Sequence, residues 1–245
     1  MTTLRCTTYN VHGFRNSHGD YSPERIEAVI AGCGADLVAL QEAEAPETGD
    51  PLPDMAQRLG MQLYTGVGGS RATAFLSRLP LRGVRETHLG QGGWCLQADL
   101  DRQGKRLHVF NLQLSFTPSK RRVQFGTLLS SDLLGNPSLV CPTLILGDFA
   151  DPLWWLSSFW FENNLFKAPR PVLGATYPAP FPLLGRDRAY LRGDIRVLES
   201  RVIRTQEARK ASSHLPVVLS VEILDPGSYL LLREPKKQRM EAAPG

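Results

Sequence analysis

Seven polar residues lie at the ends of short apolar runs, where the strands of a sheet would begin or end. They are Asn10, Glu42, Gln113, Asp148, Asp187, Ser213 and His214. Strand ends on a rigid scaffold carry much of the chemistry of sheet proteins. Three carboxylates and an amide suit a hard cation such as Mg²⁺, which takes oxygen ligands and commonly shares them with substrate phosphate oxygens. These residue types therefore predict a metal-assisted reaction of a phosphoester.

The stretch Leu144–Asp151, with the sequence LILGDFAD, contains one of these strand ends. Its first three residues form a short apolar run, typical of a strand buried on both faces. Gly147 is expected to let the backbone turn sharply where that strand ends. Asp148 would then lie at the C-terminal end of the strand. The alternative is that Asp148 caps a helix expected over Pro152–Asn163, because aspartate is a preferred N-cap residue.

Apolar periodicity predicts the other elements. Strands are expected over Leu4–Val11, Asp36–Gln41, Met61–Tyr64, Thr73–Ser77, Trp94–Asp101, Lys105–Leu114, Ala189–Leu191, Arg196–Arg204 and Pro216–Ile223. Helices are expected over Ser22–Cys33, Asp54–Leu59 and Ser119–Leu133. The segment Ala168–Arg186, rich in proline and glycine, is expected to be a long ordered loop. Strands interspersed with helices, without an internal repeat, indicate a single α/β domain.

The composition is that of an ordinary globular chain, with 245 residues, 42% hydrophobic and 21% charged. The net charge of +4 gives only weak support to nucleic-acid binding, because part of it lies in the tail Arg233–Arg239. The cysteines are scattered and are expected to be buried thiols of a reducing compartment; they are Cys6, Cys33, Cys95 and Cys141. No signal region and no membrane-spanning apolar run is present in the sequence, so we expect a cytoplasmic protein.

Five segments resemble the motifs of the endonuclease/exonuclease/phosphatase superfamily, in the order expected for it. They are TYNVHG at Thr8–Gly13, ALQE at Ala39–Glu42, LILGDF at Leu144–Phe149, DRAYLRG at Asp187–Gly193 and SSHLPVV at Ser212–Val218. The superfamily includes pancreatic deoxyribonuclease, abasic-site endonucleases, neutral sphingomyelinases and inositol-polyphosphate phosphatases. The resemblance implies a four-layered α/β sandwich, with two mainly antiparallel sheets face to face and helices outside. The resemblance covers nearly all of the chain up to Ile223, so we expect a domain over residues 1–224, and the remainder, ending KKQRMEAAPG, is expected to be a C-terminal tail over residues 225–245.

The resemblance also implies roles for the strand-end residues. Glu42 resembles the Mg²⁺ ligand, with Asn10 beside it, and Mn²⁺ is the alternative ion. Asp148 resembles the carboxylate that orients or deprotonates the attacking water. Asp187 resembles a carboxylate that supports a histidine or a metal, and His214 resembles the histidine that contacts the scissile phosphate. In this set, metal and imidazole neutralise charge on the phosphoryl oxygens while a carboxylate prepares the water.

Three positions depart from the family pattern. Ala150 stands where GDFN has an asparagine, which removes an amide that would contact the phosphate. Gln113 replaces the histidine of NTHL, and an amide can hydrogen-bond a phosphate but cannot donate a proton as an acid. Ser213 replaces the aspartate of SDHLPV that would hold His214 and stabilise its charged form. Restoring all three family residues together is therefore expected to raise metal-dependent hydrolysis.

Each candidate also has a purely structural interpretation. Asn10 would simply end its strand in a turn, and Glu42 would belong to a solvated acidic loop. Asp187 would form an exposed ion pair within RDR, and His214 would be a hydrogen-bonded histidine at a strand end. The other histidines are expected to be structural or exposed: His12, His18, His88 and His108. The aromatic residues of segment 154–161 are expected to pack between sheet and loop, with a lipid- or base-contacting patch as the alternative.

The sequence thus supports two functional hypotheses. The first is a divergent Mg²⁺-dependent phosphoester hydrolase, similar to phosphodiesterases and nucleases, in which water attacks phosphorus. The second is a catalytically impaired or inactive member of the superfamily that binds a phosphate ligand or nucleic acid. In both hypotheses the partner is a phosphoester, either nucleic acid or small molecule, and the protein is a monomer without an integral membrane segment.

Overall fold

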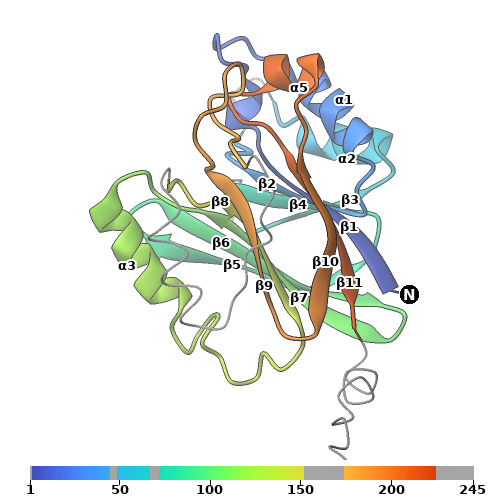
Figure 1. Cartoon of the computed structure of the whole chain (residues 1–245), viewed down its shortest axis with the longest axis vertical. Coiled ribbons are helices and arrows are strands. Elements are labelled where there is room, and N and C mark those ends of the chain that lie inside the picture. Colours follow the sequence, from blue (N-terminus) through green and yellow to red (C-terminus); the bar gives the residue numbers. More distant parts are fainter. Residues whose placement is uncertain (1, 45–48, 67–71, 152–173, 225–245) are drawn as a thin grey trace, which may run out of the picture.

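The computed structural model describes residues 2–44, 49–66, 72–151 and 174–224, and its strands form two sheets packed face to face (Figure 1). The six-stranded sheet contains, in spatial order, β10 (Ile195–Val202), β11 (Val217–Ile223), β1 (Thr2–Asn10), β2 (Leu37–Gln41), β4 (Thr73–Ser77) and β3 (Gln62–Thr65). The five-stranded sheet contains β5 (Leu81–Gly90), β6 (Gly93–Arg102), β7 (Lys105–Gln113), β8 (Thr143–Asp148) and β9 (Asp187–Arg192). Within these sheets, β1 and β2 are parallel, β7 and β8 are parallel, and the other neighbours are antiparallel.

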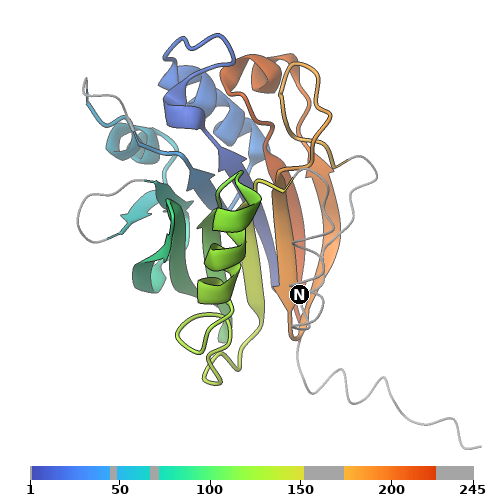
Figure 2. The same ribbon diagram turned by 90° about the vertical axis from the view of Figure 1, so that its left-hand side faces the viewer.

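Helices cover the outer faces of both sheets. α1 (Pro23–Cys33), α2 (Leu52–Arg58) and α5 (Gln206–Ala211) pack on the six-stranded sheet, and α3 (Pro118–Leu128) packs on the five-stranded sheet (Figures 1 and 2). A short 3-10 helix, η1 (His12–Phe14), follows β1. The predicted four-layered α/β sandwich, with two mainly antiparallel sheets and helices outside, is confirmed.

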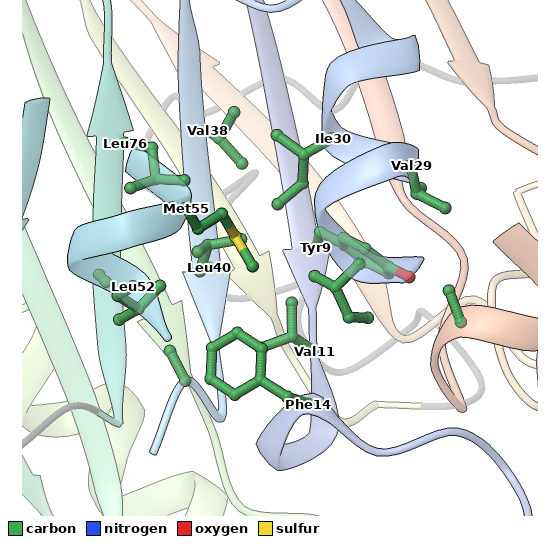
Figure 3. Close-up of a cluster of buried hydrophobic side chains, with 14 of the residues drawn as sticks. Tyr9, Val11, Phe14, Val29, Ile30, Val38, Leu40, Leu52, Met55 and Leu76 are labelled. Carbon is green, nitrogen blue, oxygen red and sulfur yellow. The ribbon is translucent and has the colours of Figure 1, made fainter. Parts of the chain in front are cut away.

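Three apolar clusters fill the spaces between the four layers. Between the sheets, Leu144 and Leu146 of β8 belong to the same cluster as Leu37 of β2. Ile145 points to the opposite face and joins the cluster beneath α3. Figure 3 shows the third cluster, in which Ile30 of α1 and Met55 of α2 pack on the six-stranded sheet. Because successive residues of β8 enter different clusters, a continuous apolar run is required there, as the sequence predicted.

Several expected elements differ in the structure. α3 ends at Leu128 rather than Leu133. Neither β5 nor α5 was expected from the sequence. The expected long loop Ala168–Arg186 is described only from residue 174 onward, where it contains one isolated pairing, Tyr177 with Leu184. The expected helix Pro152–Asn163, with its aromatic residues, lies outside the described residues. The tail 225–245 lies outside them too, so the division into a domain of residues 1–224 and a tail remains a prediction.

The thiols of Cys6, Cys33 and Cys95 are buried and Cys141 is partly buried, and all four cysteines are free. Among the helices that the structure describes, none combines the length and the apolar character needed to cross a lipid bilayer.

Gly147 does not turn the chain at the end of the strand, contrary to expectation. It lies inside β8, between Leu112 of β7 and Arg188 of β9, with φ +152°. A Cβ added to Gly147 would lie 2.2 Å from the carbonyl oxygen of Leu112. Glycine is required here because the backbone of the neighbouring strand approaches closely, next to the site residue Asp148.

We therefore expect Gly147→Ala to lower the free energy of unfolding by about 3 kcal/mol, since neither strand can move without repacking both clusters around it. Gly126→Ala is the matched control, because Gly126 lies in α3 with open space around its Cα. The control should raise stability by about 0.5–1 kcal/mol, the usual gain of alanine over glycine in a helix. Denaturant unfolding measures both changes. Equal stability of the two variants would contradict the interpretation.

Candidate active site

The parallel strand pairs bring four candidate residues to one edge of the sandwich. Asn10 ends β1 and Glu42 directly follows β2, which runs parallel to β1. Gln113 and Asp148 end β7 and β8, and these residues are direct partners in the parallel ladder of the second sheet. Because the carboxyl ends of parallel neighbours lie at the same edge, each sheet contributes two of the four residues.

Antiparallel neighbours bring the remaining candidates to the same edge from the opposite chain direction. Asp187 is the first residue of β9 and pairs with Asp148. His214 lies three residues before β11, whose first residue, Val217, pairs with Thr8 near the end of β1. The site therefore straddles the two sheets.

Asn10 connects the two sheets directly. Its Nδ2 donates hydrogen bonds to Oε1 of Glu42 at 2.9 Å and to Oδ2 of Asp148 at 3.0 Å. Its Oδ1 accepts the backbone N–H of His12 at 3.0 Å, which is the turn contact that a structural interpretation expects. The buried Asn10 amide thus both shapes the turn and holds two carboxylates side by side.

Glu42 is the most accessible carboxylate of the group, with a side chain 32% exposed. Its Oε2 lies 3.1 Å from Nδ1 of His12, and its backbone N–H donates to Oε1 of Gln113 at 3.3 Å. Burial opposes its charge, but hydrogen bonds from His12 and Asn10 lower the pKa of Glu42 to about 2. The site therefore contains an ionised carboxylate at neutral pH that can be reached from solvent.

Asp148 is buried and surrounded by donors. Its Oδ1 accepts the backbone N–H of Ala150 at 2.8 Å, and its Oδ2 accepts Nη2 of Arg186 at 2.7 Å in addition to Asn10. Burial raises the pKa of Asp148, and the neighbouring carboxylate of Asp187 raises it further. A carboxylate whose pKa is raised by burial is a stronger base than one in water, which suits the acceptance of a proton.

Asp187 and His214 form a buried pair, with Oδ2 of the aspartate 2.8 Å from Nδ1 of the imidazole. The exposed ion pair that RDR suggested is therefore wrong. Burial alone would lower the pKa of His214, but the charge and hydrogen bond of Asp187 raise it above its ordinary value. Ser213 does replace an aspartate beside His214, but the imidazole still has a carboxylate, because Asp187, expected to support a histidine or a metal, contacts it from the other sheet.

These carboxylates can hold a divalent cation. Ligand atoms of Asp148, Asp187 and His214 all lie within 4.8 Å of one another. Oδ1 of Asp187 is buried and has no hydrogen-bond partner within the described parts of the chain, so it has unused capacity as an acceptor. With Glu42 on the far side of Asn10, the donor set is dominated by carboxylate oxygen, which is the chemistry that Mg²⁺ and Mn²⁺ favour.

A cleft of about 420 Å³ opens beside Glu42, and its walls include Arg15, Trp94 and Gln113. Both charge signs and an aromatic ring therefore line the approach to the ionised carboxylate.

The sequence interpretation missed two residues of this site. His12 was expected to be structural or exposed, although it lies two positions after Asn10 in TYNVHG, and its ring contacts Glu42. Arg186 precedes Asp187 in RDR, and the charge alternation suggested a solvated surface. Its side chain is in fact 14% exposed and bound to Asp148.

Ala150 has φ +49°, in the left-handed region that alanine rarely adopts. Asparagine tolerates this conformation far better, because its side chain can hydrogen-bond locally. The family asparagine that is absent here is therefore the residue that the backbone itself favours.

Beneath the site, a buried amide pair joins the sheets. Nε2 of Gln41 donates to Oδ1 of Asn111 at 2.6 Å, and Nδ2 of Asn111 donates to the carbonyl oxygens of Leu40 and Ala74 at 2.8 and 2.9 Å. Gln41 immediately precedes Glu42, and Asn111 lies two residues before Gln113.

Comparison of the sequence with models of protein families identifies one family that matches most of the chain. The family model described as the Endonuclease/Exonuclease/phosphatase family matches residues 7–214. No curated protein matches the chain in sequence.

Solved structures share the fold. An endonuclease/exonuclease/phosphatase from Beutenbergia cavernae has a TM-score of 0.71 at 21% identity, covering 91% of this chain and 72% of its own. A mannosyl-6-phosphatase of Bacteroides thetaiotaomicron has a TM-score of 0.73 at 18% identity, covering 89% and 99%. TDP2 of D. rerio, complexed with a single-strand DNA product, has a TM-score of 0.69 at 14% identity, covering 91% and 100%.

Proposed function

The chain belongs to the endonuclease/exonuclease/phosphatase family, whose members include nucleases and phosphatases, and from this membership we propose that it hydrolyses phosphoesters with the help of Mg²⁺ or Mn²⁺. The observation that carries the proposal is the convergence of Asn10, Glu42 and Asp148 across the two sheets, with the Asp187–His214 pair beside them.

Glu42 is the residue that we propose to hold the metal, with Asn10 beside it. Glu42 is ionised, reachable from the cleft and adjacent to further oxygen donors. When bound, the cation neutralises charge on the phosphoryl oxygens and stabilises the charge that develops as the phosphoester reacts. Asn10 fixes the spacing between Glu42 and Asp148, because its amide nitrogen donates a hydrogen bond to each carboxylate.

Asp148 is the proposed base. It is held in one orientation by the backbone N–H of Ala150 and by Asn10, so an oxygen of its carboxylate can accept a proton from the attacking water. Its burial favours this proton transfer by raising its pKa.

His214 is proposed to contact the phosphoryl group. Asp187 occupies Nδ1 of the ring, which leaves Nε2 to donate to a phosphoryl oxygen. Because Asp187 raises the pKa of His214, the imidazolium form that makes such a bond persists at higher pH than in an ordinary histidine. Gln113 is proposed to donate its amide N–H to the substrate, since its Oε1 is already bonded to Glu42.

The substrate class that we propose is a phosphoester of nucleic acid or of a small molecule. Two proteins of the same fold represent these two substrate classes: one is called a mannosyl-6-phosphatase, and the other is complexed with single-strand DNA product. The alternative function is phosphate-ligand or nucleic-acid binding without turnover. It is favoured by Ala150, which lacks the amide usual in the family, by Gln113, which cannot donate a proton as the family histidine can, and by the ion pair that occupies Asp148.

The test is the hydrolysis of bis(p-nitrophenyl) phosphate and of p-nitrophenyl phosphate, a diester and a monoester, with EDTA and then with added Mg²⁺ or Mn²⁺. We expect activity only with metal. We expect Glu42→Gln to weaken activation by metal about tenfold or more, because a charged oxygen ligand is lost. Titration calorimetry with Mn²⁺ should show the same loss of affinity.

Glu24→Gln is the matched control, because Glu24 is an exposed glutamate of the first turn of α1. It should retain both activity and metal affinity. If Glu42→Gln and the natural protein hydrolyse the substrates equally, Glu42 does not hold the metal. If the natural protein binds metal and phosphate but hydrolyses neither ester, the binding function replaces the hydrolase.

A further inference from the structure

We propose that Arg186 binds the phosphoryl oxygens of the substrate, exchanging Asp148 for them when the substrate arrives. The inference rests on the proposed function, since it takes the ligand to be a phosphoester. Arg186 lies outside the family motifs, because DRAYLRG begins one residue later, at Asp187. It therefore adds a cation that the motifs do not supply.

The guanidinium of Arg186 is placed against the proposed base. Its Nη2 lies 2.7 Å from Oδ2 of Asp148, and the side chain is only 14% exposed. Burial opposes its charge, but the carboxylates of Asp148, Asp187 and Glu42 together raise the pKa of Arg186. A permanent cation thus lies within one hydrogen bond of the atom proposed to accept the proton from water.

Aromatic rings fix the plane of this guanidinium. Its central carbon lies 4.8 Å from the ring centroid of Tyr177 and 6.0 Å from that of Phe116. The Tyr177 ring is also 4.9 Å from the imidazole of His214. A guanidinium stacked on aromatic faces keeps its N–H edges available and loses little entropy on binding an anion. The Tyr177 ring therefore holds the guanidinium of Arg186 near His214 and Asp148, the two groups proposed to act on the phosphate and the attacking water.

Arg186 has unused hydrogen-bonding capacity. Its Nε is buried and has no acceptor among the residues that the structure describes. A guanidinium presents its donors as a rigid fork that matches two oxygens of a phosphate. In the free protein this fork is only partly used, by Asp148. An incoming phosphoryl group supplies the acceptors that the fork lacks.

The exchange of partners leaves no buried carboxylate without donors. When Arg186 turns to the substrate, Asp148 keeps the hydrogen bonds of Asn10 and of the Ala150 backbone N–H. Breaking a buried ion pair is costly when one partner is left uncompensated. Here Arg186 pairs with the phosphate and Asp148 retains two hydrogen-bond donors, so neither charge is left without a partner.

Arg186 also compensates for the departures at neighbouring positions. The family asparagine that would contact the phosphate is replaced by Ala150, and the family histidine is replaced by Gln113. The first change removes an amide from the phosphoryl oxygens, and the second replaces an imidazole, which can carry a positive charge, by a neutral amide. A guanidinium at 2.7 Å from Asp148 places a full positive charge in the same small volume.

The experiment measures binding of inorganic phosphate by titration calorimetry in EDTA, so that neither metal nor turnover contributes. Arg186→Gln is expected to weaken phosphate binding about tenfold to hundredfold, the usual effect of losing charge-assisted hydrogen bonds. Arg186→Lys should recover part of the loss, since it keeps the charge but not the fork. Arg122→Gln is the matched control, because Arg122 is an exposed arginine of α3, and it should change the affinity less than twofold.

A double-mutant cycle with Asp148→Asn tests whether Arg186 binds the phosphate itself or serves only as the counter-ion of Asp148. If Asp148 competes with phosphate for Arg186, Asp148→Asn should strengthen phosphate binding about tenfold in the natural background. The gain should shrink to about twofold when Arg186→Gln is also present, because the competition no longer exists. If Arg186 serves only as the counter-ion of Asp148, Arg186→Gln leaves phosphate affinity unchanged, and the proposal is overturned.

The outcomes also distinguish this inference from the proposed function. Phosphate binding that depends on Arg186, in a protein that hydrolyses no ester, supports the inference and rejects the hydrolase. Metal-dependent hydrolysis that survives Arg186→Gln with the same KM and the same phosphate affinity rejects the inference and supports the hydrolase. Thermal unfolding of each variant shows which of them are folded. If Arg186→Gln does not fold, Arg186→Lys replaces it in the comparison, because lysine keeps a positive charge beside Asp148.

Discussion

In the Asp148→Asn variant, kcat for metal-dependent hydrolysis of bis(p-nitrophenyl) phosphate is expected to fall by about 10²–10⁴-fold, the usual effect of removing a general base. The asparagine retains the size of the side chain but cannot accept a proton from water at neutral pH. KM should change much less than kcat, and downward, because the loss of the base concerns the transition state, while substrate binding gains only from the end of the competition between Asp148 and the phosphoryl group for Arg186.

The substitution also changes the surroundings of Asp148. Three donors, from Asn10, Arg186 and the Ala150 backbone, point at its two oxygens. An amide at this position presents an NH₂ group to at least one of them, so we expect some loss of stability. Circular dichroism and thermal unfolding are therefore measured beside the rate. Asp132→Asn, at an exposed position, is the matched control and should keep the rate of the natural protein. A folded Asp148→Asn variant with undiminished kcat would show that Asp148 is not the base.

The second large effect is a gain. Introducing Gln113→His and Ala150→Asn together is expected to raise kcat by about 10²-fold, because an imidazole can donate a proton and the asparagine supplies an amide to the phosphate. The gain is expected to be less than the product of the separate effects, since residues that act as a unit are not additive. A folded double variant with the rate of the natural protein would show that these positions do not belong to one site.

Ala150→Asn has a second readout that does not depend on catalysis. Because Ala150 has φ +49°, asparagine should raise the free energy of unfolding by up to about 1 kcal/mol. Ser213→Asp, which the sequence would have added to the pair, is expected to give no gain in rate. His214 already has a carboxylate in Asp187, and a second one would be buried beside it. A rise in rate on Ser213→Asp alone would show that Asp187 does not serve His214 as we propose.

The sandwich was predicted from the resemblance of five segments to the family motifs, whereas most of the site residues were found because they adjoin uninterrupted apolar strands. Asn10, Glu42 and Asp148 each lie at or just after the C-terminal end of such a strand, and His214 lies three residues before the start of one. The C-terminal ends of parallel neighbours share an edge of the sheet, and an antiparallel neighbour begins at that same edge. The positions of these residues can therefore be recognised from the neighbouring residues in the sequence. The partner of His214 is not local, because it depends on which strand of the other sheet begins opposite Asp148.

The misses have physical causes. β5 has the sequence LRGVRETHLG, lies at an edge of its sheet and has few fully buried residues, so apolar alternation is weak there. α5 is six residues long and is fixed by the hydroxyl of Thr205, which accepts the backbone N–H of Ala208. Arg186 has the charge of a surface residue, and only its contacts in the folded structure, with Asp148 and with the ring of Tyr177, place it in the interior.

The amide pair Gln41–Asn111 governs the alignment of the site through its directionality. Apolar side chains between two sheets fix how far apart the sheets lie, but they resist sliding of one sheet over the other only weakly. A hydrogen bond between amides is directional, and this one is reinforced by the carbonyl oxygens of Leu40 and Ala74. Glu42 belongs to one sheet and Asp148 to the other, so lateral slip would alter the spacing between them. The buried Gln41–Asn111 pair therefore fixes the lateral position of one sheet relative to the other, and with it the distance between Glu42 and Asp148 at the edge.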